Sequence, residues 1–463
     1  MSCKNKEPFS WRTFSKFVGG AGIMVSTGYT DPGNYSTNLA ASKFKYSLLF
    51  VILFSNIMAM VFQSLCIKLG VVTKLDLSES CKKYCNKYVS FGLYLLCELA
   101  IASTDLAEVI GSAIALKLLF GLPIVYGVIL TGFDVLFILL FFKAKFLKYF
   151  EMGIILLIVS IATCFFILVF KTTSDWSGVA LGFLPNPTIL SNNEALYIII
   201  GLIGSTLMPH NLYLHSNLVK YRSSRQGKLG DVVEIKNQDE KDIFKNRFIY
   251  SILRYLYWDS SLCLAFALFI NSSILISASS SNIQTNDLTD AFNLFTNNLG
   301  KFSGILFAIA LLLSGQSSTI TGTMTGQIVM SGFLGEKFKI SPWIRRLITR
   351  SLAIIPAVII ASTSGESGLS KLLVLSQVVL SLQLPFAIWP LIYFTSNKNI
   401  MTITCVKYTK ETDSNNSVDD NTLNNEISES IDFSNNIVTK IVIVGMGLLI
   451  SGLNIYVLTK INQ

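Results

Sequence analysis

Two four-residue strings in this chain combine side chains that can bind a metal ion with a residue that interrupts a helix. They are Asp-Pro-Gly-Asn at residues 31–34 and Met-Pro-His-Asn at residues 208–211. Each string lies inside an apolar stretch long enough to cross a membrane. Acid, amide, thioether and imidazole groups are costly to bury at that depth, and a membrane protein retains them where a function uses them. The pair therefore predicts a metal site near the middle of a membrane.

The residues in and around the two strings define the chemistry of the expected site. Proline removes one helical hydrogen bond and so frees backbone carbonyl groups as oxygen ligands, which we expect at Gly28 and Ser205. Asp31 supplies negative charge, Asn34 a neutral oxygen and Met208 a soft sulfur. Ca²⁺ and Mg²⁺ gain nothing from a thioether, so this mixed set favours a transition metal. A lone kink or a lone methionine is normally structural, whereas two matched kinks with complementary ligands favour a functional site.

Further polar residues in the apolar stretches suggest a path for protons. His210 suits a proton relay because imidazole titrates near neutral pH, whereas we expect His215 to make a structural polar contact. Asp105 and Glu108 are three residues apart and share one helix face, where buried carboxyls can hold protons or pair with arginines. The candidate arginines are Arg345, Arg346 and Arg350. Asp134 and Asp259 are further intramembrane acids, and Gln377 is a possible further metal ligand.

The elements that position these residues are predicted to be membrane-spanning helices. Hydrophobic residues make up 51% of the chain and charged residues only 14%, against about a quarter in soluble proteins. Eleven apolar runs of spanning length give an all-α polytopic membrane protein. The predicted spans are 17–41, 46–69, 90–119, 122–143, 150–171, 194–220, 248–278, 300–334, 343–362, 369–396 and 437–459.

The distribution of basic residues predicts the orientation of the spans. Lys and Arg concentrate in the segments that are cytoplasmic if the N-terminus lies inside, which predicts a cytoplasmic N-terminus. The net charge of +9 follows from this bias and from contact with anionic lipid headgroups. It does not indicate nucleic-acid binding, since no basic stretch is interleaved with aromatic residues.

The two strings also predict an internal repeat. Pro209 follows Pro32 by 177 positions, and Asn211 follows Asn34 by the same 177 positions. The strings lie in the first and sixth predicted spans, and five spans lie between the start of the first and the start of the sixth. Because five is odd, the sixth span enters the membrane from the side opposite to the first, as in inverted-repeat transporters with broken helices. The expected organisation is a tail at 1–16, a core at 17–396 with repeats 17–171 and 194–396, a disordered cytoplasmic loop at 397–436, and a last span with a short outer tail at 437–463.

Further strings extend the pattern along the chain. They lie at residues 68–77, 104–116, 314–323, 345–351 and 375–386. Together with the two opening strings, they resemble the NRAMP (natural resistance-associated macrophage protein) family of divalent-metal transporters, from the first span through the tenth. Gly28 and Ser205 stand where that family often has alanine, which a backbone ligand tolerates.

The resemblance implies a LeuT-like fold of five plus five inverted spans, with discontinuous first and sixth helices. It also implies proton-coupled uptake of Mn²⁺ or Fe²⁺ into the cytoplasm. The implied metal ligands are Asp31, Asn34, Met208, the carbonyls of Gly28 and Ser205, and in some conformations Gln377. The implied proton-handling residues are Asp31, His210, Asp105 and Glu108, with Arg345 or Arg346 at the inner end.

Two other function classes remain open on the sequence. A metal sensor would be expected to carry a large soluble output domain, and the tails here are short. A related carrier for Mg²⁺ or Al³⁺ would not need the Met208 thioether. No nucleophile elbow, phosphate loop or histidine-rich zinc pattern indicates an enzyme. We expect no cofactor, a functional monomer, and a location in the plasma membrane or in a vacuolar or endosomal membrane; the sequence does not separate Mn²⁺ from Fe²⁺.

Overall fold

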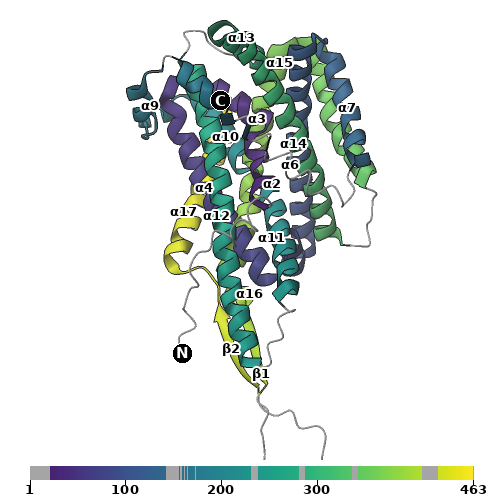
Figure 1. The fold of residues 1–463 in the computed structure, drawn as a ribbon, viewed down its shortest axis with the longest axis vertical. Helices are drawn as coiled ribbons and strands as arrows, with labels where there is room; N and C mark the ends of the chain where they lie inside the picture. Colours follow the sequence, from purple (N-terminus) through teal and green to yellow (C-terminus); the bar gives the residue numbers. More distant parts are fainter. Residues whose placement is uncertain are drawn as a thin grey trace, which may run out of the picture.

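A computed structural model of the chain describes residues 21–141, 156, 159–160, 162–163, 165–172, 174–230, 238–280, 287–335, 342–408 and 426–461. These residues form a bundle of helices with one two-stranded sheet beyond its end (Figure 1). The α-helices are α2 (Ala21–Ser26), α3 (Pro32–Ala41), α4 (Leu49–Thr73), α5 (Leu77–Tyr84), α6 (Lys87–Phe120), α7 (Ile124–Phe141), α9 (Trp176–Gly182), α10 (Asn193–Leu207), α11 (Pro209–Gly230), α12 (Gln238–Ser279), α13 (Leu288–Leu299), α14 (Lys301–Leu334), α15 (Pro342–Ser396), α16 (Lys398–Met401) and α17 (Ile437–Ile461). The 3₁₀ helices are η1 (Gly28–Thr30), η2 (Ser42–Leu48) and η4 (Pro187–Ser191).

Many of these helices are long and apolar enough to cross a membrane. Within the described residues, seven helical segments meet that criterion, and the chain is an integral, multi-pass membrane protein. Two of the segments each include all of one predicted span and part of the span before it. In the first, η2 makes the turn between them, with Lys45 at φ 50°. In the second, α15 consists of two helices that meet at Gly365 (φ 61°, ψ −145°). Parts of the predicted fourth and fifth spans, and residues 17–20 of the first, lie outside the described residues.

Both predicted helix breaks are present. Asp31 has an extended backbone (φ −78°, ψ 168°) between η1 and α3, and Pro32 is the first residue of α3. Met208 leaves helical geometry (φ 28°, ψ 102°) between α10 and α11, and Pro209 opens α11. Proline is favoured at the first position of a helix because an N–H group there has no hydrogen-bond acceptor within the helix, so proline loses nothing by lacking one. The prediction of discontinuous first and sixth helices is therefore confirmed.

The broken helix α2–α3 lies in the middle of the bundle (Figure 1). It bridges two buried apolar clusters, because Tyr29 belongs to the cluster around α4, α10 and α12, and Tyr35 belongs to the cluster around α6, α13 and α14. Contact with α6 is close, since a Cβ atom built on Gly111 would lie 2.2 Å from the Pro32 Cβ atom. The break is therefore held by packing from both sides.

Residues 397–436 differ from the predicted disordered loop. Strands β1 (Thr402–Tyr408) and β2 (Glu426–Asp432) pair antiparallel, with Thr402 opposite Asp432, and residues 409–425 lie outside the described residues. These two strands lie inside the predicted loop, and the disorder of the loop as a whole stays a prediction. That prediction rested on the polar composition between the strands, whereas β1 itself is rich in β-branched residues that favour strands. The hairpin lies beside one end of α12 (Figure 1).

Candidate metal site

Asp31 uses its two carboxylate oxygens differently. Oδ1 accepts a hydrogen bond of 2.8 Å from the backbone N–H group of Asn34, and so caps the start of α3. Oδ2 is buried, and none of the residues that the structure describes donates a hydrogen bond to it. A buried oxygen without a donor is unfavourable unless a ligand completes it. One oxygen of Asp31 thus holds the helix, and the other is available to a cation.

The Asn34 side chain lies among the oxygens that the sequence predicts as ligands. Its Nδ2 atom donates to the Gly28 carbonyl (3.2 Å), to Asp31 Oδ1 (2.8 Å) and to the Ser205 carbonyl (3.1 Å). An amide NH₂ group has two hydrogens, so it cannot fully satisfy three acceptors. Oxygens from both broken helices therefore converge on one small region, which is the arrangement that a hard or intermediate cation requires.

Met208 brings a sulfur atom from the second break. Its side chain is fully buried, and its Sδ atom accepts a hydrogen bond from Asn211 Nδ2 at 3.5 Å. Asn211 also lies against the first break, since a Cβ atom on Gly28 would be only 2.4 Å from Asn211 Nδ2. The Ser205 hydroxyl bonds Thr37 Oγ1 at 3.2 Å, which leaves the carbonyl of Ser205 as the group that faces Asn34.

Gln377 of α15 also reaches the site. A Cβ atom on Gly33 would lie 2.1 Å from Gln377 Nε2, so the amide packs directly against the backbone of this glycine. Gln377 Nε2 donates to Ser376 Oγ at 3.0 Å, and no described residue donates to its buried Oε1 atom. All six residues predicted to bind metal are thus gathered around the two breaks.

The donor set is mixed in type. Among the described residues, no group of three or more His, Cys, Asp and Glu side chains is close enough to hold a metal ion. Any ion at the breaks would be held by one carboxylate, two amides, backbone carbonyls and a thioether. Such a set has a low total charge and one soft ligand, which suits ions such as Mn²⁺ and Fe²⁺ better than Ca²⁺.

The predicted proton-handling residues lie next to this site on α6 and α11. His210 is buried, and its Nδ1 atom lies 3.5 Å from Thr104 Oγ1. Asp105 follows Thr104 on α6 and is also fully buried. His210 follows Met208 by two residues, so this polar group begins at the second break.

The acids of α6 pair with arginines of α15. Glu108 Oε2 accepts from Arg350 Nη1 (3.2 Å) and from Thr319 Oγ1 (2.8 Å), and both charged side chains are almost fully buried. Arg345 instead pairs with Glu98 at 2.5 Å. Glu108 therefore pairs with Arg350, whereas Arg345 pairs with Glu98. The side chain of Arg346 lies outside the described residues.

A second buried chain of polar side chains was not predicted from the sequence. His215 Nδ1 lies 2.5 Å from Gln63 Oε1, and Gln63 Nε2 donates to the Tyr29 hydroxyl at 2.7 Å. This chain connects α11 through α4 to the first break. The expected polar contact of His215 is therefore present, and an uncharged glutamine inside an apolar span was the signal that could have identified its partner.

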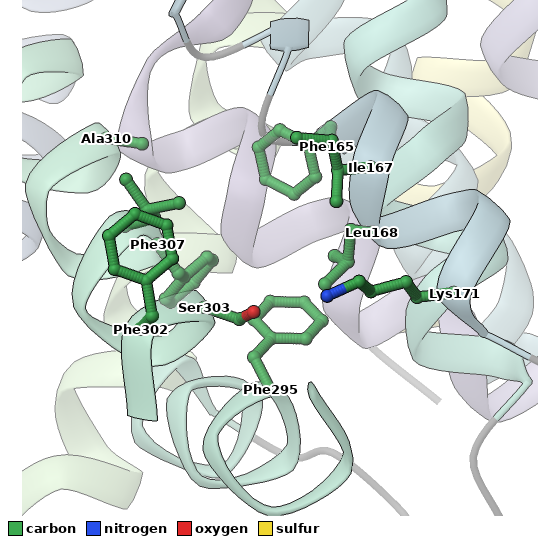
Figure 2. A pocket seen from close by; sticks show the side chains of 10 residues that line it. Phe165, Ile167, Leu168, Lys171, Phe295, Phe302, Ser303, Phe307 and Ala310 are labelled. Atoms are coloured by element: carbon green, nitrogen blue, oxygen red, sulfur yellow. The ribbon is translucent and has the colours of Figure 1, made fainter. Parts of the chain in front are cut away.

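An apolar cavity of about 180 Å³ lies apart from these ligands. Figure 2 shows aromatic side chains lining it, with Lys171 at one side. Two of its lining rings, Phe165 and Phe307, pack on Tyr35 at centroid distances of 5.8 and 6.0 Å. Tyr35 follows Asn34 directly, so the cavity walls support α3 and do not themselves supply metal ligands.

Comparison with known proteins establishes the family. The family model described as natural resistance-associated macrophage protein-like (Nramp) matches residues 22–409. The chain belongs to the Nramp family. It is 47% identical over 398 residues to a protein of Nostoc named divalent metal cation transporter MntH, covering 84% of this chain and 85% of that one. It is 45% identical over 403 residues to a natural resistance-associated macrophage protein 2 homolog of Dictyostelium discoideum, covering 86% and 60%.

Solved structures agree with this assignment. The manganese transporter of Eremococcus coleocola superposes with a TM-score of 0.77 at 30% identity, covering 97% of this chain and 88% of that one. The nucleobase-cation-symport-1 family transporter Mhp1 shares the fold, with a TM-score of 0.53 at 12% identity and coverage of 81% and 78%. The Nramp chain therefore has the predicted LeuT-like fold, and it is a transporter rather than an enzyme.

Proposed function

We propose that this Nramp protein carries Mn²⁺ or Fe²⁺ into the cytoplasm together with protons, by alternating access. The observation that carries the proposal is the convergence of the Gly28 carbonyl, Asp31 Oδ1 and the Ser205 carbonyl on the Asn34 amide. Relatives named divalent metal cation transporter and manganese transporter support the choice of substrate. In this proposal the ion, which is the cargo, is bound between the two breaks.

Each residue has a distinct role in the proposal. Asp31 binds the ion through Oδ2, and its carboxylate provides the negative charge of the metal site. Asn34 turns its amide so that Oδ1 faces the ion, because the oxygen and nitrogen of an amide occupy nearly equivalent positions. The Met208 thioether favours transition metals, and Gln377 Oε1 joins the ligands in one of the transport states.

Protons share Asp31 with the metal ion in the proposal and then leave the metal site by their own route. They pass from Asp31 by way of His210 to the α6 face that carries Asp105 and Glu108, with Arg345 or Arg346 at the inner end. The distance of 3.5 Å between Thr104 and His210 and the pairing of Glu108 with Arg350 support continuity along this face. Because the routes diverge after Asp31, a proton that leaves Asp31 would not have to follow the path of the metal ion.

The broader setting is part of the proposal. We place the N-terminus in the cytoplasm and the protein in the plasma membrane or in a vacuolar or endosomal membrane, acting as a monomer. The transporter core is 17–396 in two inverted repeats, 17–171 and 194–396, followed by the segment 397–436 and the last span within 437–463. An acidic compartment outside would drive metal uptake by supplying protons.

Uptake into vesicles tests the assignment. Purified protein is reconstituted into liposomes, and radiolabelled Mn²⁺ uptake is measured at outer pH of about 5.5 and 7.5. We expect faster uptake at the lower pH and loss of uptake in Asp31→Asn. The matched control is Asp175→Asn, which changes an exposed acid that caps α9 and should leave uptake unchanged. Undiminished uptake in Asp31→Asn would refute the assignment.

A second variant tests selectivity. Met208→Ala removes the thioether and leaves the oxygen ligands, so we expect it to admit Ca²⁺ or Mg²⁺ that the natural protein excludes. Competition of each ion against radiolabelled Mn²⁺ measures this. If the natural protein already carries Ca²⁺ well, the selectivity argument fails while metal transport itself stands.

A further inference from the structure

The first break frees several backbone carbonyls, and their partners differ. In an intact helix each carbonyl accepts a hydrogen bond from the N–H group four residues later, and buried carbonyls that lose this partner must find another. Residues 27–31 span the break, and every one of them is buried. The hydrogen-bond partners of these five carbonyls determine which of them could turn toward an ion.

Four of the five carbonyls are bonded outside the proposed metal site. The Tyr29 carbonyl accepts from Asn271 Nδ2 at 2.9 Å, and the Thr30 carbonyl accepts from the Ser314 hydroxyl. The Thr27 carbonyl accepts from the N–H group of Thr30 and from Ser318, and that of Asp31 accepts from the N–H group of Tyr35.

The Gly28 carbonyl is different, because it accepts from Asn34 Nδ2, which belongs to the site itself. When Asn34 turns its oxygen to an ion, this carbonyl loses that donor and gains the ion. The carbonyls of Tyr29 and Thr30, the two residues that follow Gly28, are instead held by side chains of α12 and α14.

Asn271 is well fixed for this task. Its Oδ1 atom accepts from Asn38 Nδ2 at 2.8 Å, so the NH₂ group of Asn271 must face the Tyr29 carbonyl. One asparagine on α12 thereby bonds both the break and α3. Twelve residues earlier on α12, about 18 Å along the helix, Asp259 accepts from the Gly22 N–H group of α2 at 3.0 Å. Helix α12 thus runs along the broken helix and contacts both of its halves.

We infer that Asn271 and Ser314 are positioning residues for metal binding. By holding the carbonyls of Tyr29 and Thr30, they fix the rotation of the break so that the Gly28 carbonyl is the one that meets the ion. Asn38 acts one step further away, by orienting the Asn271 amide. This inference rests on the proposed function. Neither Asn271 nor Ser314 is a proposed metal ligand, because each bonds a backbone carbonyl of the break and not the ion.

The inference predicts a change in affinity rather than in maximal rate. Asn271→Asp keeps the side chain's shape but replaces its donor with an oxygen that repels the Tyr29 carbonyl. The lost hydrogen bond should raise the KM for Mn²⁺ uptake and the Kd for Mn²⁺ roughly tenfold, with the maximal rate within about twofold of the natural protein. Ser314→Ala, on a different helix, should act in the same direction. Ser272→Ala, beside Asn271 on α12, is the matched control and should change neither constant.

A double-mutant cycle separates positioning from general damage. Asn38→Ala should raise the Kd less than Asn271→Ala does, and the double variant should equal Asn271→Ala alone, because Asn38 acts only through Asn271. Thermal unfolding of each purified variant checks that its fold is kept. Additive effects, an unchanged Kd in both Asn271→Asp and Ser314→Ala, or a fall in maximal rate with unchanged KM would overturn the inference.

Failure of the proposed function gives a different result. If Mn²⁺ does not bind the natural protein, or binds Asp31→Asn equally well, the proposed function is wrong. If binding is lost in Asp31→Asn but unaltered in Asn271→Asp and Ser314→Ala, only the positioning role is wrong.

Discussion

Two glycines of α6 allow a sharp test of how packing sets the metal site. At Gly92 an added Cβ atom would meet nothing within 4 Å, whereas at Gly111 it would lie 2.2 Å from Pro32 Cβ and 2.5 Å from Pro32 Cγ. Alanine is favoured over glycine in a helix by about 1 kcal/mol, so both Gly→Ala substitutions should stabilise the helix backbone by the same free energy. Only Gly111→Ala collides with the break.

The size of the collision gives the expected effect. Ordinary contact begins at 3.4 Å, so Pro32 must retreat by about 1.2 Å from a Cβ atom at 2.2 Å. Overpacking of this kind costs about 1–3 kcal/mol, which cancels or exceeds the helix gain. Pro32 is bonded to Asp31, and misplacement of a functional group by about 1 Å can reduce activity about 100-fold.

Stability and transport are measured on the same preparations. Gly92→Ala should raise the thermal unfolding midpoint slightly and leave Mn²⁺ uptake unchanged, while Gly111→Ala should not be stabilised and should raise the KM at least tenfold. The reasoning fails if Gly111→Ala matches Gly92→Ala in both measurements, since α6 would then have no part in placing the break.

Three further predictions concern the framework around the site. Glu108→Gln removes the Glu108 carboxylate from the buried ion pair with Arg350 and should lower the free energy of unfolding by about 3–5 kcal/mol, whereas adding Arg350→Met should recover most of the loss; chemical denaturation measures both. Asp76→Ala removes the capping box that Asp76 forms with Glu79 and should cost about 1 kcal/mol, seen as faster hydrogen exchange of the α5 amides. Asn435→Ala removes the amide that bonds the end of α15 and should expose the β1–β2 hairpin to protease, with unchanged cleavage counting against this role.

The sequence predicted the breaks and their ligands because those features are local. A proline beside metal-capable side chains in an apolar span is informative without knowledge of the fold, and Asp31 and Met208 lie in the breaks that the sequence predicted. The equal spacing of the two strings was enough to pair them.

The partners of the charged residues could not be predicted in the same way. Arg345 and Arg350 are five residues apart on α15, and helix geometry alone allows either to face the acids of α6. Their assignment to Glu98 and Glu108 depends on how α15 is rotated against α6. The role of Asn271 was equally hidden, because its partners are 233 and 242 residues away along the chain.

The hairpin was missed for a different reason. Composition averaged over 397–436 is dominated by the Asn, Ser and Asp residues between the strands, and it obscures two short segments with strand character. Pairing between segments that are separated in this way is not a property of either segment alone.

The repeated asparagines show how an inverted duplication can be specialised. In each half, an asparagine amide bonds the side chain three residues before it: Asn34 bonds the Asp31 carboxylate, and Asn211 bonds the Met208 sulfur. The supporting asparagine is the same in both halves, while the atom it supports is a charged oxygen in one and a neutral sulfur in the other. Evolution can therefore alter the preference for one ion over another by exchanging a single residue in one half, while the other half continues to provide the charge that any cation needs.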